Sequence, residues 1–191
     1  MMNSSLLSLK NNVANVLFVG VTAISITVTG CAGGGSTAHQ VGVATGNATP
    51  DIITESKNGD WLQLHALKGS YVLVEFWESG NSEARKNHFE MDRLYKKYKN
   101  AEFKDGKNFC VYSVSLDTDK QKWLDALAAD NVSWPCQTID TKSWNAKSAI
   151  DFEVNFLPKY YLINGHGQIV NRNILIDDLE DIIKAELNQD C

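Results

Sequence analysis

The chain has 191 residues, of which 43% are hydrophobic and 21% are charged. Its 18 basic and 23 acidic residues give a formal net charge of −5 at pH 7 and form no basic stripe, so nucleic acid is not expected as a partner. The four cysteines and four histidines show no zinc-type spacing, and we therefore expect neither a metal site nor a cofactor.

The first thirty residues are typical of a secretory signal peptide, with Lys10 followed by an apolar stretch over 13–29. The stretch ends in Val-Thr-Gly-Cys at 28–31, which resembles the bacterial lipobox and implies cleavage before a lipid-modified Cys31. Ala32 supplies no inner-membrane retention signal, so we expect a lipid-anchored protein of the bacterial cell envelope, attached to the outer membrane. The predicted layout is a signal peptide over 1–30, a flexible tether over 31–50 and one domain over 51–191.

The domain is expected to begin with a β-hairpin that leads into a buried strand. Two short runs, 51–55 and 61–65, flank an Asn58-Gly59 turn, in which Gly59 readily takes positive φ. After Leu67-Lys68-Gly69, the run 71–77 is apolar, β-branched and aromatic except for Glu75, as in a strand covered on both faces. Asn81 then begins a helical pattern, so residues 71–85 predict a strand, a loop and a helix.

Alternating helical and strand patterns fill the rest of the chain. They predict helices over 81–99, 119–131, 144–152 and 177–188, and strands over 109–117, 135–140, 159–164 and 168–172.

Residues 74–85 resemble the active-site stretch of thioredoxin-like proteins of the TlpA/ResA type and the AhpC/TSA-like group. That stretch runs Val-Asp/Glu/Asn-Phe-Trp-Ala-x-Trp-Cys-x-x-Cys-Arg/Lys. Phe76, Trp77, Ser79 and Arg85 match it, but its two cysteines fall on Asn81 and Ala84. The resemblance covers about residues 51–188. It implies an α/β thioredoxin-like fold with a central mixed sheet flanked by helices, an N-terminal hairpin and an inserted α-β element.

The replaced cysteines decide what the junction can do. In this family the first thiol lies at a helix N-terminus, where free amides and the helix dipole lower its pKa, and the second resolves the mixed disulfide. Neither Asn81 nor Ala84 can form a disulfide. Asn81 is interpreted either as a helix N-cap, worth about 1 kcal/mol, or as an amide that contacts a ligand.

Five residues are candidates for a binding groove at this junction: Glu75, Asn81, Ser82, Pro158 and Lys159. The resemblance places Glu75 under the second cysteine position, where burial would raise its pKa, so it is either an acid/base group or a structural carboxyl. The resemblance also implies that Pro158 follows a cis peptide bond beside the site. Lys159 replaces the usual threonine.

Three cysteines follow Cys31. Cys110 and Cys136 begin two neighbouring strands and are candidates for a structural disulfide in an oxidising compartment, whereas Cys191 is the terminal residue. Among the other aromatic and basic side chains, His88 is interpreted as a helix-face residue, and Trp134 and Trp144 as either core or an exposed patch.

Three functions are compatible with these observations. The first is a redox-inactive binding module for a peptide, a protein or a small ligand, held in the groove beside Asn81 and Pro158. The second is a thiol-disulfide oxidoreductase or peroxidase, the family's activity, that uses a relocated cysteine at Cys110, Cys136 or Cys191. The third is an envelope scaffold with no ligand groove in use.

Overall fold

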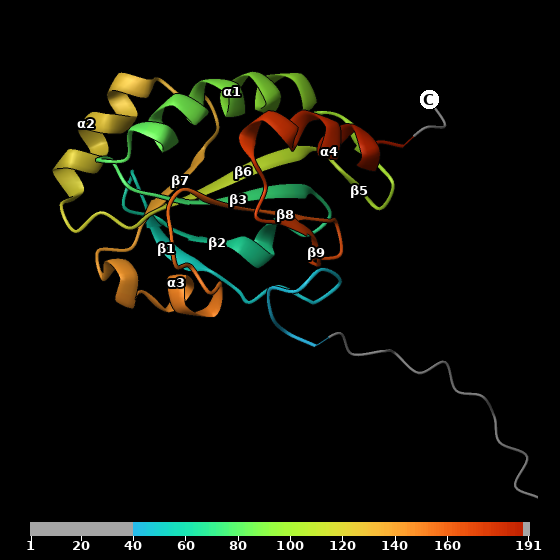
Figure 1. Ribbon diagram of the computed structural model, residues 1–191, viewed down its shortest axis with the longest axis horizontal. Coiled ribbons are helices and arrows are strands. Elements are labelled where there is room, and N and C mark those ends of the chain that lie inside the picture. Colours follow the sequence, from blue (N-terminus) through green and yellow to red (C-terminus); the bar gives the residue numbers. More distant parts are fainter. Residues whose placement is uncertain (1–39, 189–191) are drawn as a thin grey trace, which may run out of the picture. The chain divides into compact units, whose positions relative to one another are not determined.

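A seven-stranded mixed sheet forms the centre of the computed structural model, which describes residues 40–188 (Figure 1). The strand order is β2-β1-β7-β6-β3-β8-β9. The strands are β1 (Ile53–Ser56), β2 (Trp61–Gln63), β3 (Tyr71–Trp77), β6 (Phe109–Ser115), β7 (Cys136–Ile139), β8 (Lys159–Ile163) and β9 (Ile169–Arg172).

The middle of the sheet is parallel and its edges are antiparallel. β3 runs parallel to β6, with Glu75 opposite Ser113, and β6 runs parallel to β7, with Ser113 opposite Gln137. β8 is antiparallel to β3, and its Tyr160 also lies opposite Glu75. All seven residues of β3 are buried, as expected for a strand covered on both faces.

Helices cover both faces of the sheet (Figure 1). On one face, α1 (Ser82–Tyr98), α2 (Lys120–Asp130) and α4 (Leu179–Glu186) pack on the odd-numbered β3 side chains. The opposite face carries the short helices η1 (Leu64–Leu67) and α3 (Lys147–Asp151). Two further 3-10 turns, η2 (Ser143–Asn145) and η3 (Ile176–Asp178), precede α3 and α4.

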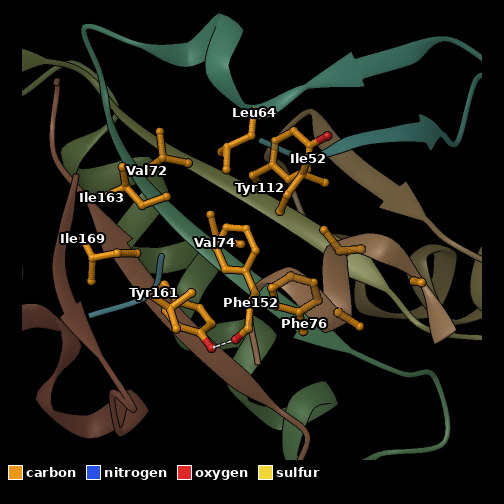
Figure 2. Close-up of a cluster of buried hydrophobic side chains, with 14 of the residues drawn as sticks. Ile52, Leu64, Val72, Val74, Phe76, Tyr112, Phe152, Tyr161, Ile163 and Ile169 are labelled. Carbon is orange, nitrogen blue, oxygen red and sulfur yellow. Dashed lines mark hydrogen bonds between the residues drawn. The ribbon is translucent and has the colours of Figure 1, made fainter. Parts of the chain in front are cut away.

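The core under α3 is built from alternate residues of the central strands. Val72, Val74 and Phe76 of β3 meet Tyr112 of β6 and Tyr161 of β8 in this layer (Figure 2). The Tyr161 hydroxyl donates to the main-chain carbonyl of Phe152, which lies just beyond α3. Burying each of these large side chains stabilises the fold by roughly 1.5–3 kcal/mol.

The predicted element order is confirmed, with differences at three places. Residues 40–50, expected to belong to the flexible tether, pack on the domain: Val43 and Thr49 are buried, and Ala48 bridges to Gln168 next to β9. The sequence patterns also missed a small separate hairpin, β4 (Glu102–Phe103) and β5 (Gly106–Lys107). Phe89 is an apolar residue within the helical pattern over 81–99, but on α1 it is 81% exposed.

Several predictions concern residues that lie outside the described range. They are the signal peptide over 1–30, the first part of the tether over 31–39 with its lipid-bearing Cys31, and the terminal Cys191. Within 40–188, no helix combines the length and the apolar character that crossing a membrane requires.

Candidate functional site

The loop between β3 and α1 is held from both sides by side-chain hydrogen bonds. Asp117, just after β6, accepts hydrogen bonds from the Ser79 main-chain N–H at 2.9 Å and from the Ser79 hydroxyl at 2.7 Å. The same carboxylate accepts from the Ser115 hydroxyl at 2.6 Å. The loop that precedes α1 is therefore fixed to the parallel centre of the sheet.

Asn81 is the N-cap of α1, in agreement with the first of its two interpretations. Its Oδ1 accepts hydrogen bonds from the main-chain N–H groups of Glu83 and Ala84, both at 3.0 Å. An asparagine cap of this kind satisfies the amides that would otherwise face a thiolate or a ligand. Ala84 is fully buried, and Ser82 is exposed at the first position of the helix.

Asn81 also ties the helix start to the proline loop. Its Nδ2 donates to the main-chain carbonyl of Leu157 at 3.0 Å, and the Leu157-Pro158 peptide bond is cis. Both the oxygen and the nitrogen of the Asn81 side-chain amide are therefore hydrogen-bonded within the protein. The Leu157 carbonyl is consequently engaged by the chain itself and is less available to a bound extended peptide.

A buried ion-pair network lies beneath the helix start. Glu75 is fully buried, and its Oε2 accepts a hydrogen bond from the Ser113 hydroxyl at 2.6 Å. Its Oε1 is 3.3 Å from Nε2 of His88, close enough for an ion pair but misaligned for a hydrogen bond. On the other side of the ring, His88 Nδ1 is 2.7 Å from Oδ2 of Asp130, which also receives Arg85 Nε at 2.5 Å.

Two carboxylates keep this buried histidine basic. Burial alone would lower the pKa of His88, but the charges of Glu75 and Asp130 and the hydrogen bond with Asp130 outweigh it and raise the pKa above its ordinary value. The rings of Trp77 and Trp134 flank the imidazole, with centroids 4.4 and 5.6 Å away. Glu75 and His88 are enclosed by the sheet and α1, whereas the side chains of Arg85 and Asp130 are 28% and 10% exposed.

The sequence indicated part of this network. It interprets Glu75 as either an acid/base group or a structural carboxyl, and His88 only as a helix-face residue. The signal that could have identified His88 is Glu75, because a carboxylate in an otherwise apolar buried strand requires a buried partner.

The two described cysteines are free thiols, so the candidate disulfide does not form. Cys136 lies opposite Tyr112, two residues along from Cys110 on the neighbouring parallel strand. Strands about 4.8 Å apart with a rise of about 3.3 Å per residue separate such Cα atoms by about 8 Å, beyond the reach of a disulfide. Burial raises the pKa of Cys110, and burial with the nearby Cys110 raises that of Cys136 to about 11.

A groove of about 120 Å³ lies between the start of α1, the proline loop and the segment that leads to α4. The apolar side chains of Phe156 and Leu175 are 51% and 70% exposed along it. The groove is lined by Glu83, Asn87, Phe156, Pro158, Lys159, Tyr160 and residues 173–176. The structure therefore brings Pro158 and Lys159 to one groove, whose lining includes neither Asn81 nor Ser82. Glu75 lies in the interior.

Among residues 40–188, no three His, Cys, Asp or Glu side chains gather in a way that could hold a metal ion. What this site offers a ligand is shape, exposed apolar surface and hydrogen-bonding groups.

The chain is similar in sequence to two proteins of Bacillus subtilis (strain 168). Thiol-disulfide oxidoreductase ResA is 25% identical over 129 residues, which cover 67% of this chain and 66% of ResA. Thioredoxin-like protein YneN is 26% identical over 133 residues, which cover 68% of this chain and 71% of YneN. The match to ResA thus spans slightly less than two thirds of its length. No family model matches the chain.

Solved structures agree with these relatives. The thioredoxin domain of a thiol-disulfide oxidoreductase from Bacteroides vulgatus superposes with a TM-score of 0.68 at 28% identity, covering 76% of this chain and 99% of that domain. A thiol:disulfide interchange protein from Bacteroides sp. gives a TM-score of 0.65 at 29% identity, with 78% and 93% covered. The predicted fold class is confirmed: the sheet and its helices form a thioredoxin-like fold, similar to thiol-disulfide oxidoreductases of the ResA type.

Proposed function

We propose that this thioredoxin-like chain, although similar to thiol-disulfide oxidoreductases, is a redox-inactive binding module. One observation carries the proposal: Asn81 is hydrogen-bonded to both the helix start and the proline loop. The sequence resemblance places Asn81 and Ala84 at the positions of the family's two thiols. A dithiol mechanism needs a nucleophilic sulfur at this helix end and a second one a turn later.

The proposed binding surface is the groove beside Pro158. The exposed Phe156 and Leu175 provide apolar contact area, and Asn87 provides an amide whose Nδ2 donates to the Tyr160 hydroxyl at 3.1 Å. Because Asn81 engages the Leu157 carbonyl, the ligand is expected to contact the side chains of the groove more than the backbone of the proline loop. A peptide, a protein segment or a small molecule fits this description.

The first experiment is an insulin-disulfide reduction assay with the full chain in a mild detergent, beside a working thioredoxin and a no-protein control. We expect background activity. Reduction above background would contradict the proposal and direct attention to the remaining cysteines one at a time.

The second experiment tests the groove by crosslinking the protein in cells. Phe156→Ser and Leu175→Ser are expected to abolish capture of the crosslinked partner. The matched control is Trp61→Ser, which changes an aromatic side chain that is 71% exposed on β2 and does not line the groove. Capture that survives both groove variants would rule out this surface.

The competing function, an oxidoreductase or peroxidase with a relocated cysteine, requires a thiol of low pKa. Cys110 and Cys136 have raised pKa values instead, which supports the binding module. Alkylation of Cys110, Cys136 and Cys191 as a function of pH tests the alternative directly. A thiol that reacts with an apparent pKa well below 8 would revive it.

We also propose that Cys31 carries the lipid that anchors the protein to the outer membrane. The support is the signal-like stretch with its Val-Thr-Gly-Cys ending. Incorporation of labelled palmitate should disappear in Cys31→Ala, and membrane fractionation should place the wild-type protein with the outer membrane. Labelling that persists in the variant would contradict the anchor.

A further inference from the structure

Lys159 is a buried cation with no anionic partner among residues 40–188. Only 7% of its surface is exposed, yet none of the ion pairs between described residues includes it. Its Nζ donates to two neutral acceptors, the main-chain carbonyl of Glu153 and Oδ1 of Asn155, both at 3.1 Å. An ammonium group has three donors, so one N–H is left over.

A second cation lies beside it. Arg172 on β9 is exposed, and its Nη1 reaches only the main-chain carbonyl of Val43, at 3.5 Å. Burial and the charge of Arg172 lower the pKa of Lys159, and the charge of Glu153 opposes them only in part. Two neighbouring cations repel each other, and a buried charge is normally paired. An anion from solution would therefore stabilise this pair of cations.

The space for such an anion is present. A polar pocket of about 280 Å³ is lined by Lys159, Arg172, Asn155, Asn173, Glu153 and Phe156, together with Val43 and Tyr161. Glu153 is the single carboxylate among these lining residues. Its charge acts on Lys159, but it forms none of the ion pairs between described residues. With two positive charges and one negative, the lining carries a net charge of +1, which matches a monoanion such as a carboxylate better than a phosphate dianion.

The pocket adjoins the groove described above. Phe156, Lys159 and Asn173 line both, and Lys159 Nζ lies 4.8 Å from the centroid of the Phe156 ring. We propose that Lys159 and Arg172 form a carboxylate-binding subsite that receives an acidic group of the ligand held in the groove beside Pro158. The subsite rests on the proposed binding function for its ligand, and it gives that ligand a chemical class: a molecule with a carboxylate next to an apolar part.

The test uses small probes that need only the subsite. Ligand-observed NMR with the full chain in a mild detergent compares N-acetylglutamate N-methylamide with its neutral isostere, N-acetylglutamine N-methylamide. We expect the glutamate probe to bind at least tenfold more tightly. N-acetylglutamine with a free terminal carboxylate distinguishes a side-chain carboxylate from a chain terminus, because the better of the two carboxylate probes identifies the source.

Lys159→Met and Arg172→Gln should each weaken binding of the preferred probe at least tenfold. Lys159→Met removes the charge and keeps an aliphatic side chain in the core. Because Arg172 is exposed, Arg172→Gln is expected to fold, and it tests the subsite even if Lys159→Met does not fold. Lys122→Met, an exposed lysine on α2 that does not line the pocket, is the matched control and should leave binding unchanged.

Equal binding of the charged and neutral probes, or binding unaffected by Arg172→Gln, would overturn the subsite. Inorganic phosphate that binds more tightly than either carboxylate probe would overturn the assignment to a carboxylate. Probe binding that depends on Lys159 and Arg172 would support the subsite even if crosslinked partners were insensitive to Phe156 and Leu175. The subsite and the proposed function can therefore fail separately.

Discussion

His88 is buried between Glu75 and Asp130, and its charge depends on both carboxylates. An opposite charge within about 4–6 Å shifts a pKa by about 1–3 pH units. Glu75→Gln keeps the shape of the side chain and removes one of the two charges. We expect the pKa of His88, followed by NMR titration, to fall by about one pH unit or more. Glu90→Gln, on the exposed side of α1, is the control, and an unchanged His88 pKa in Glu75→Gln would refute the ion pair.

The same charge makes stability depend on pH. The folded-state pKa of His88 is raised above its ordinary value of about 6.5, so the folded protein holds this proton more tightly than the unfolded chain does. The resulting stability is fully present below about pH 6.5 and is lost as the pH rises through the folded-state pKa. We expect the free energy of unfolding in urea to fall across that window, by up to about 1.4 kcal/mol per pH unit. A profile that rises with pH there would contradict a charged His88.

Asn81 has two structural roles that can be separated by mutation. Asn81→Ala removes both the cap and the bond to Leu157, so we expect a loss of about 1–3 kcal/mol in the free energy of unfolding. Asn81→Ser keeps an uncharged acceptor for the first-turn amides and removes the amide donor to the Leu157 carbonyl, so its loss should be smaller. Ser82→Ala, exposed at the next position, is the control. Equal losses in the two Asn81 variants would mean that the bond to Leu157 contributes most of the effect.

At the scale of elements, the segment 40–50 behaves as part of the sheet's edge. The Thr49 main-chain N–H donates to the Gly167 carbonyl at 3.0 Å, and the Ile169 N–H donates to the Asn47 carbonyl at 2.9 Å. The segment contacts the turn between β8 and β9. This turn is tightly packed, because a Cβ on Gly165 would come within 2.1 Å of the Asp105 carbonyl oxygen. Small, polar residues without periodicity had indicated a tether, but local composition does not report main-chain hydrogen bonds to a strand more than a hundred residues away.

Two valines of this segment provide the test. Val43 is 4% exposed in the core under α3, whereas Val41 is 65% exposed. Val43→Ala should lower the free energy of unfolding by about 1–3 kcal/mol, since it removes buried methyl groups and leaves a cavity. Val41→Ala should leave it within about 0.5 kcal/mol. Urea unfolding of both variants decides whether residues 40–50 belong to the folded domain. If neither variant changes the free energy of unfolding, these residues belong to the tether instead.

At the scale of the whole molecule, the chain has a thioredoxin-like fold, and the proposed function rests on Asn81 and Ala84 standing where the related enzymes carry two thiols. We therefore expect Asn81→Cys with Ala84→Cys to form a disulfide but to reduce insulin at least tenfold more slowly than thioredoxin. The reason is Glu83, whose carboxylate opposes a neighbouring thiolate and so raises the thiol pKa. Adding Glu83→Pro, which the first turn of a helix tolerates, should recover part of the rate. A double variant as fast as thioredoxin would show that Glu83 has no such effect.

The sequence by itself determined the order of the elements, the resemblance to the thioredoxin-like frame, and the presence of Asn81 and Ala84 where that resemblance implies two thiols. These follow from local patterns: apolar alternation, helix periodicity, a cap residue and a short motif. Only the tertiary structure decided that His88 completes a buried network with Glu75 and Asp130, that Cys110 and Cys136 are out of register for a disulfide, and that Lys159 and Arg172 share a pocket. Each of these depends on strand register or on which face a side chain occupies, and such distances are set by pairings between segments that are remote in the chain.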